Sequence, residues 1–238
     1  MARCSDARPV SAAPVLSVII PALEEAHGIA ACIDALRPLH DAGAEILVID
    51  AGSRDATAAL AAAAGVRVLQ AARGRAAQMN TGTDIARGGM LAFLHADTRP
   101  TPDACRRLLD LAGRRGERWG RFDVRLSGPG AAFRVIESCM NLRSRLTGIA
   151  TGDQLMFASR SLFQRAGGFP DVPLMEDVAL SGRLKRLASP CCCRERVHTS
   201  SRRWRQHGVL RTVLHMWRLR AAFWLGADPA RLAQHYDA

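Results

Sequence analysis

The sequence predicts an α/β fold in which a mostly parallel central sheet is flanked by helices. Two observations support this prediction: short apolar runs alternate with helical segments through the first half of the chain, and several of the runs end in a carboxylate. Such alternation is typical of a parallel sheet wrapped by helices, which binds its ligands at the carboxyl ends of the strands. With 238 residues the chain is long enough for one large domain with a short tail.

The first strand is expected at 15–20, because a β-branched apolar run ends there at Pro21. A continuous apolar run is typical of a strand covered on both faces. A helix over 24–36 should follow. A second buried strand at 44–50 ends in Asp50, which places a carboxylate at the carboxyl end of the sheet.

The next segment begins with a turn at Gly52, after which Ser53 is expected to cap a helix over 54–64. The remaining elements of this half follow the same alternation. They are a strand at 66–69, a helix at 74–87, a strand at 90–94 and a helix that begins at 101–103 with a threonine cap and a proline.

The pattern changes after Arg118. Residues 122–126 alternate apolar and charged side chains, which predicts a half-exposed strand. The second half is therefore expected to be mixed α/β. Its further elements are a helix at 131–146, a strand at 155–158 and helices at 161–166 and 177–187.

A basic helix is expected over 209–225. Arg211, His215 and Arg218 share one helical stripe among apolar residues, whereas Arg220 lies opposite and interrupts a clean two-faced pattern. We consider two hypotheses for this helix: association with an anionic membrane surface, or packing onto its own domain or a dimer partner.

Charge and cysteine content limit the classes of partner. The formal net charge is +11, almost entirely from arginine, yet the aromatic interleaving and groove-reading motifs of nucleic-acid-binding proteins are missing, so no nucleic acid is expected. Cys191, Cys192 and Cys193 are adjacent and lack zinc-site spacing. The apolar run at 15–20 is too short for a signal peptide, and no window of about 18 uninterrupted apolar residues occurs that could span a membrane. We therefore expect a cytoplasmic protein.

Carboxylates at strand ends are the first candidate functional residues. Asp50 and Asp97 end two strands that would border one crevice of the sheet. Asp97 is the candidate ligand for Mg²⁺ or Mn²⁺, because diphosphate oxygens and water can complete the coordination around one carboxylate. Glu176 and Asp177 follow a turn-rich loop and open a helix, where they are either electrostatic caps or a general base.

Several nucleotide-binding and catalytic motifs are missing from the sequence. The first strand is not followed by G-x-G-x-x-G, and neither the P-loop pattern nor G-x-S-x-G occurs anywhere. These absences disfavour a dinucleotide dehydrogenase, a P-loop NTPase and an α/β-hydrolase.

Four motifs in order resemble the inverting family-two glycosyltransferases of the GT-A fold. They are the first strand with its loop, Ile19–Glu25; the segment Val48–Thr57; the triplet His95–Asp97; and the pair Glu176 and Asp177. The resemblance covers about 15–205. Glu24 stands where the family usually has Asn, and His95 replaces the first Asp of its D-x-D motif, as in a small bacterial subgroup that has H-A-D-T.

The resemblance implies a role for each matched residue. Asp97 would bind Mg²⁺ or Mn²⁺, and Asp177 would be the catalytic base with Glu176 beside it. The nucleotide would be bound by Pro21, Ala22, Glu24, Asp50, Gly52, Ser53, Asp55, Arg75, Gln78, His95 and Ala96. The acceptor side would contain Gly152, Asp153 and Gln154, and the leaving group would be stabilised by Arg202, Arg203 and Trp204.

The resemblance also implies a division of the chain and an activity. The division is a flexible N-terminus (1–14), a GT-A domain with a nucleotide-binding half (15–100) and an acceptor half (101–205), and a basic helical tail (206–238). The activity would be transfer of a sugar, a hexose in the first instance, from a nucleoside diphosphate to an acceptor hydroxyl. A lipid acceptor and a peripheral position on the inner face of the membrane would suit the tail.

Two alternative functions remain open on the sequence. One is a sugar nucleotidyltransferase on a related scaffold, although the glycine- and lysine-rich loop of such enzymes is missing after the first strand. The other is a non-catalytic protein that binds anionic lipid or RNA through the basic segment 194–220.

Overall fold

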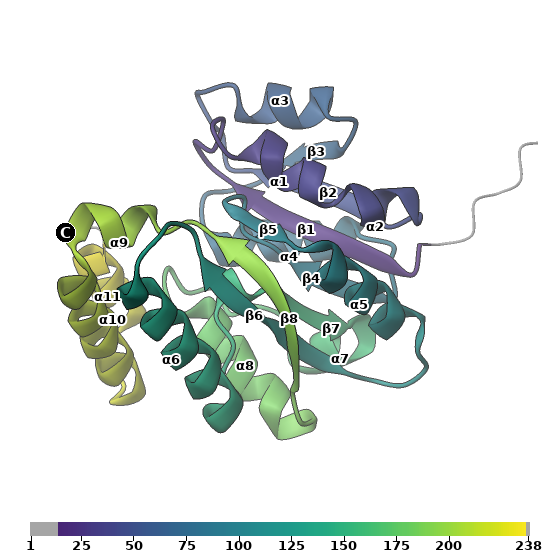
Figure 1. Ribbon diagram of the computed structural model, residues 1–238. Helices are drawn as coiled ribbons and strands as arrows, with labels where there is room; N and C mark the ends of the chain where they lie inside the picture. Colours follow the sequence, from purple (N-terminus) through teal and green to yellow (C-terminus); the bar gives the residue numbers. More distant parts are fainter. Residues whose placement is uncertain (1–13, 237–238) are drawn as a thin grey trace, which may run out of the picture.

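The computed structural model describes residues 14–236, in which a mixed eight-stranded sheet is covered by helices (Figure 1). The strands lie in the order β3-β2-β1-β4-β7-β6-β8-β5. This confirms the predicted α/β class; the flexible N-terminus expected at 1–14 lies almost entirely outside the described residues. The strands are β1 (Leu16–Ala22), β2 (Glu45–Asp50), β3 (Arg67–Gln70), β4 (Met90–Phe93), β5 (Thr98–Pro100), β6 (Trp119–Leu126), β7 (Met156–Ser159) and β8 (Cys191–Thr199).

Strand direction divides the sheet into two parts. β1, β2, β3 and β4 are mutually parallel where they pair, as the alternating first half of the sequence predicts. β7 runs antiparallel to β4 and to β6, β6 pairs in parallel with β8, and β5 is antiparallel to β8. The second half is therefore mixed, as expected.

Helices cover both faces of the sheet, with α1, α2 and α5 on one face and α4, α7 and α8 on the other. Successive side chains of a strand point to opposite faces: in β1, Leu16, Val18 and Ile20 join the first core and Ile19 joins the second. The helices are α1 (Ile29–Ala35), α2 (Arg37–Asp41), α3 (Thr57–Ala63), α4 (Arg75–Ile85), α5 (Pro102–Gly113), α6 (Ala131–Thr147), α7 (Arg160–Arg165), α8 (Glu176–Leu187), α9 (Arg202–His207), α10 (Val209–Trp224) and α11 (Pro229–Tyr236), with the 3-10 turn η1 (Gly152–Gln154).

Two helix starts lie later than the sequence predicts. The helix expected from residue 24 begins at Ile29, because Glu24 has a left-handed backbone (φ 55°) that a helix cannot contain. The helix expected from residue 54 begins at Thr57, and Ser53 does not cap it. Instead, the carboxylate of Asp55 accepts the Thr57 N–H at 2.9 Å, which satisfies a donor of the first turn. The threonine cap predicted for α5 is confirmed.

The prediction of a half-exposed strand at 122–126 is wrong. β6 is buried along almost its whole length, because α6 packs against it (Figure 1). Arg121 is only 1% exposed; its guanidinium forms an ion pair with Asp123, which also accepts from Arg145 at 2.5 Å. Arg121 Nε donates to Ser144 Oγ at 2.9 Å. Arg121 and Asp123 of β6 thus point into a satisfied polar network rather than into solvent.

The C-terminal helices pack onto the protein's own domain. On α10, Leu219 is buried in a small apolar cluster with Ile149 and Val178, and Leu232 of α11 joins it. The basic helix predicted over 209–225 is present as α10, and self-packing is the arrangement observed for it. No helix in the described part of the chain has the length and apolar character of a membrane span.

Candidate active site

The carboxyl ends of β1, β2 and β4 bring the predicted strand-end residues to one edge of the sheet. Ala22 at the end of β1 pairs with Asp50 at the end of β2, and Phe93 of β4 lies beside Ile19 of β1. The loop that carries His95 to Asp97 therefore follows directly beside the first two loops. Parallel topology makes this the edge at which a ligand would bind.

Asp50 organises the loop after β2. It is 1% exposed, and its Oδ2 accepts the backbone N–H groups of Gly52 and Ser53, each at 3.0 Å. The Ser53 hydroxyl donates to Oδ1 at 2.5 Å. The carboxylate thus fixes the loop conformation while it remains at the strand end.

A second set of hydrogen bonds joins this loop to the one after β1. The Glu24 N–H donates to Ser53 Oγ at 3.0 Å, and the Ala26 N–H donates to Asp55 Oδ2 at 3.0 Å. The pKa of Asp55 is lowered, first because the Thr57 hydroxyl donates to its carboxylate and also because of the Ala26 N–H. The two predicted nucleotide loops are therefore held together as one unit.

The helix α4 contributes two of the predicted residues. Gln78 is buried, and its Nε2 donates to Ala22 O at 2.9 Å and to Ile49 O at 2.7 Å, so it joins the ends of β1 and β2. Arg75, in the first turn, has its Nη1 4.0 Å from Glu176 Oε1. Arg75 thereby connects the predicted nucleotide-binding half with the predicted catalytic pair.

His95 lies between this arginine and the turn η1. Its Nε2 is buried without a hydrogen-bond partner, and a Cβ built on Gly152 would come within 2.2 Å of that atom. Burial of the ring, with the nearby charge of Arg75, lowers the pKa of His95 to about 3. The imidazole is therefore neutral at physiological pH.

Asp97 is half-buried, and the one hydrogen bond found for it among the described residues is a long one, 3.3 Å, from Thr98 Oγ1. Its charge acts on Glu25, whose pKa is raised first by burial and then by Asp97. Glu25 Oε2 is buried with no hydrogen-bond partner. Sequence reasoning assigned no role to Glu25, although it closes the first motif.

These features fit a divalent cation beside Asp97. The carboxylate has oxygens to offer, and a cation there would offset the repulsion between Asp97 and Glu25. Within residues 14–236 no group of three or more His, Cys, Asp and Glu side chains gathers in a way that could hold a metal. A cation at Asp97 would therefore take further oxygen ligands from a phosphate group or water.

The Glu176 and Asp177 pair begins α8. Asp177 is half-buried; its Oδ2 accepts the Gly152 N–H and its Oδ1 accepts the Val178 N–H, both at 2.7 Å. Glu176 is buried, and its pKa is raised to about 7 by that burial and by the charge of Asp177, with Arg75 acting in the opposite direction. Asp177 is thus fixed in orientation against η1.

The turn η1 carries the predicted acceptor-side residues. Thr151 and Gln154 form a capping box around it, and the Thr151 hydroxyl also donates to Asp153 Oδ1 at 2.6 Å. Burial raises the pKa of Asp153. Gln154 Nε2 is buried without a hydrogen-bond partner.

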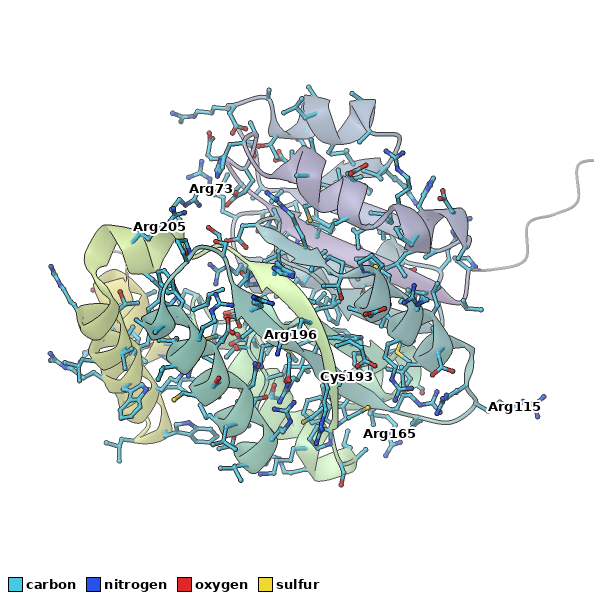
Figure 2. The ribbon with its side chains drawn as sticks, viewed as in Figure 1. Arg73, Arg115, Arg165, Cys193, Arg196 and Arg205 are labelled. Carbon is cyan, nitrogen blue, oxygen red and sulfur yellow. The ribbon has the colours of Figure 1, made fainter. Side chains whose placement is uncertain are left out.

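The helix α9 brings Arg202 to the first loop. Its Nη2 lies 3.6 Å from Glu25 Oε1, and its Nη1 lies 2.5 Å from His27 Nε2. Trp204 is half-buried, and the side chain of Arg203 lies outside the described residues. Figure 2 shows Arg205 of α9 and Arg73 of the loop before α4 on the same side of the molecule, so further positive charge lies on that side.

Unsatisfied polar atoms are concentrated at this edge of the fold. Among the described side chains, the buried nitrogen and oxygen atoms without a hydrogen-bond partner belong to Glu25, His95, Arg143, Gln154 and Arg220. Buried polar groups in folded proteins are ordinarily paired, so such a cluster indicates a place where a ligand or water completes the structure. Sequence reasoning did not identify Arg143, and it noted Arg220 only as an interruption of a pattern.

Comparisons with solved structures match this architecture. A mannosyltransferase from Pyrobaculum calidifontis, solved with GDP-Man and Mn²⁺, is 20% identical with a TM-score of 0.63; the match covers 89% of this chain and 62% of that one. The glucosyl-3-phosphoglycerate synthase from Mycobacterium tuberculosis, solved with Mn²⁺, UDP and phosphoglyceric acid, is 25% identical with a TM-score of 0.57, covering 77% of this chain and 69% of that one. A mycobacterial protein is 24% identical with a TM-score of 0.54, covering 78% and 64%.

The chain spans less than two thirds of the length of two of these three structures. No match is found among curated proteins. The sequence profile of Glycosyl transferase family 2 matches residues 17–162, more than half of the chain. The GT-A fold expected from the sequence is therefore confirmed, and the protein belongs to glycosyl transferase family 2.

Proposed function

We propose that the protein transfers a sugar from a nucleoside diphosphate to an acceptor hydroxyl with inversion at the anomeric carbon. The observation that carries this proposal is the concentration of unpartnered buried polar atoms beside two strand-end carboxylates and the Glu176 and Asp177 pair. Two similar structures, one solved with GDP-Man and Mn²⁺ and the other with UDP and Mn²⁺, support the same donor class.

The donor nucleotide would bind the joined loops after β1 and β2 and the start of α4. Asp50 holds the loop that would receive the base or ribose, and Gln78 keeps the two strand ends together. The full donor site comprises Pro21, Ala22, Glu24, Asp50, Gly52, Ser53, Asp55, Arg75, Gln78, His95 and Ala96. With His95 in place of an aspartate, the chain would belong to the small bacterial subgroup with H-A-D-T.

Asp97 would hold Mg²⁺ or Mn²⁺, which when bound supplies positive charge to the diphosphate oxygens. Arg202 lies beside the proposed metal site, with its Nη2 3.6 Å from Glu25 Oε1. It would add positive charge as the diphosphate leaves. Arg203 and Trp204 on the same helix would take part in stabilising the leaving group. Negative charge on the departing phosphate is thereby offset where it develops.

Asp177 would act as the base. Its carboxylate is oriented by the Gly152 N–H at 2.7 Å, on the side of η1 that carries Asp153 and Gln154. Asp177 takes the proton from the acceptor hydroxyl, the freed oxygen bonds to the anomeric carbon, and the bond from that carbon to the diphosphate oxygen breaks. Attack from the face opposite to the leaving group inverts the carbon, and Glu176 supports the base as its neighbour.

The outer side of α10 suits a peripheral position at an anionic membrane surface in the cytoplasm. Leu214, Trp217 and Trp224 are 53%, 66% and 64% exposed, and Arg211 and Arg218 are exposed on the same helix. Apolar and aromatic side chains flanked by arginines bind at the level of lipid headgroups. Such a position would suit a lipid acceptor, and vesicle flotation that finds no salt-sensitive binding to anionic lipid would contradict it.

The experiment that tests the donor proposal measures binding of UDP and GDP with and without Mn²⁺. Wild-type protein is expected to bind one of them with Mn²⁺, whereas Asp97→Asn should lose the metal-dependent part. Asp103→Asn, an exposed acid in the first turn of α5, is the matched control. Absence of nucleotide binding by the wild type would overturn the proposal.

The role of the base is tested separately. A positioned base contributes typically 10²–10⁴-fold. Asp177→Asn should therefore lower kcat by about that factor while it leaves nucleotide binding unchanged. Turnover is measured with a sugar donor of the nucleotide found to bind. Near-normal turnover by Asp177→Asn would show that Asp177 is not the base.

A further inference from the structure

Two helices distant in sequence each bring one incompletely satisfied arginine to the acceptor side of the site. On α6, Arg143 has its Nε and Nη2 buried without a hydrogen-bond partner; on α10, Arg220 has its Nε in the same condition. A buried charged donor without a partner is costly, more so than a neutral one. Neither residue belongs to the motifs on which the proposed function rests.

The unpartnered state is specific to these two arginines. On the same helix as Arg143, Arg145 pairs with Asp123 at 2.5 Å, and Arg134 pairs with Glu137 at 3.1 Å. The buried Arg121 of the neighbouring strand is also paired. Arg121, Arg134 and Arg145 on and beside α6 thus each have an ion-pair partner, which Arg143 lacks among the described residues.

The position of the two arginines relates them to the base. Arg143 Nη1 lies 3.5 Å from Ile149 O, at the start of the segment that leads into η1, and Arg143 is close enough to Asp177 and Asp153 to feel their charges. Arg220 follows Leu219, which packs in one cluster with Ile149 and with Val178, the residue after Asp177. Both guanidinium groups therefore lie beside the acceptor half of the site.

The positive charges of Arg143 and Arg220 are not neutralised by ion pairs in the described part of the chain. Neither arginine has an ion pair within 4.0 Å among the described residues, although Asp153 and Asp177 lie nearby. Burial, and then the like charge of Arg220, lowers the pKa of Arg143 to about 10. Two guanidinium groups that repel each other and have donors to spare would be stabilised by an oxyanion between them.

We propose that Arg143 and Arg220 form an anion-binding subsite that receives a phosphate or carboxylate group of the acceptor. This inference deepens the proposed function and rests on it for the identity of the bound molecule as an acceptor. Guanidinium groups bind both kinds of oxyanion through paired N–H donors. The acceptor hydroxyl would then be placed at Asp177 by the anionic group held a short distance away.

The subsite also accounts for the interrupted pattern of α10. Arg220 lies opposite the stripe of Arg211, His215 and Arg218, and its buried Nε places it toward the domain rather than toward solvent. The C-terminal helix would thus complete the acceptor site as well as cover an apolar surface.

The test measures binding of inorganic phosphate, glycerol 3-phosphate and glycerate by calorimetry. The proteins are the wild type, Arg143→Met, Arg220→Met and the control Arg218→Met, which changes an exposed arginine two residues from Arg220. Binding to the wild type and the control, weakened at least ~10-fold in both other variants, would support the subsite. Unweakened binding in the two variants, or none to the wild type, would overturn it.

Thermal stability in anion-free buffer separates a ligand site from a structural role. Removal of a guanidinium group whose Nε and Nη2 are buried without partners should raise the Tm of Arg143→Met by about 2–4 °C. A lower Tm would indicate that Arg143 supports the fold and would contradict the subsite. If Arg143→Met folds poorly, Arg143→Lys takes its place in the binding measurement. Arg143→Lys keeps the positive charge and should retain part of the anion binding.

Two further measurements, nucleotide binding and vesicle flotation, separate failure of the subsite from failure of the proposed function and identify the molecule that carries the anion. Binding of UDP and GDP with Mn²⁺ should be equal in all four proteins. If nucleotide binds but anions do not, the subsite is wrong and the proposed function stands; if the wild type binds no nucleotide, the proposed function fails. Arg115→Met, which changes an exposed arginine in the segment after α5, is the control for vesicle flotation. Flotation with vesicles of phosphatidic acid, compared with phosphatidylcholine, that weakens in Arg220→Met but not in Arg115→Met assigns the anion to a lipid headgroup; equal flotation of these two variants assigns it to a soluble acceptor.

Discussion

The imidazole of His95 packs directly against the backbone of Gly152, with its Nε2 where a side chain at position 152 would have to stand. The same Gly152 donates its N–H to Asp177 at 2.7 Å. One residue without a side chain therefore links the loop of the proposed metal ligand with the proposed base. The two halves of the site depend on this contact for their spacing.

Gly152→Ala should disturb both halves. The new Cβ would lie 2.2 Å from His95 Nε2, so the His95 ring or the turn η1 must shift. Overpacking of this kind costs typically 1–3 kcal/mol. We expect a lower Tm, measured by calorimetry, and a loss of turnover of at least ~10-fold as the Asp177 carboxylate shifts.

A control and a rescue make this prediction specific. Gly182→Ala lies in α8 where a Cβ would meet nothing within 4 Å, and it should stabilise the helix by up to about 1 kcal/mol. In the double variant with His95→Ala the ring is gone, so the stability loss from Gly152→Ala should be largely recovered. If the two losses simply add, the contact is not the cause.

Asp123→Ala should be among the most destabilising changes in the acceptor half. It leaves the buried Arg121 without its ion-pair partner and removes the bond to Arg145. Breaking a buried pair in this way costs about 3–5 kcal/mol. Asp34→Ala, which removes an exposed pair with Arg37, should cost under ~1 kcal/mol in the same urea titrations.

The strands that sequence predicts well are those with local signals. β1, β2 and β4 are continuous apolar runs, and α5 starts at a threonine and a proline as expected. β6 is buried rather than half-exposed because α6 packs against it and supplies partners for Arg121 and Asp123, which the alternation of 122–126 cannot reveal. β8 was missed because its pairing with β6 is non-local and its sequence is cysteine- and arginine-rich.

Some residues of the candidate site can likewise be predicted from local sequence signals, and others cannot. Asp50 and Asp97 are visible in sequence because each ends an apolar run, and the topology then brings them to one edge. Arg143 and Arg220 carry no such signal. Their significance lies in donors that are buried and unpartnered, a property of the assembled structure that depends on α6, α10 and η1 together.

Glu24→Asn should stabilise the protein slightly. Glu24 has φ 55°, a left-handed backbone that costs about 1–2 kcal/mol for most residues and less for asparagine. The loss of the bond from the Arg54 N–H to Glu24 Oε1, 2.8 Å and exposed, offsets part of the gain. We expect a net gain of about 0.5 kcal/mol in urea titration; a net loss would show that the Glu24 carboxylate matters more than its backbone.

The pH dependence of stability should report on Glu176. Its pKa is raised from 4.5 to about 7 by burial and by Asp177, so between those values the folded protein binds more protons than the unfolded chain. Stability from this group is therefore fully present below about pH 4.5 and is lost as pH rises through about 7.

Glu176→Gln, which keeps the side chain neutral, should remove this part of the pH dependence. The variant should be more stable than the wild type at pH 8, by about 3 kcal/mol, and the two should converge toward pH 5. Urea titrations across that range measure the difference directly. Parallel curves for the two proteins would mean that Glu176 ionises in the folded state as it does in the unfolded chain, and that the pair with Asp177 does not oppose its charge.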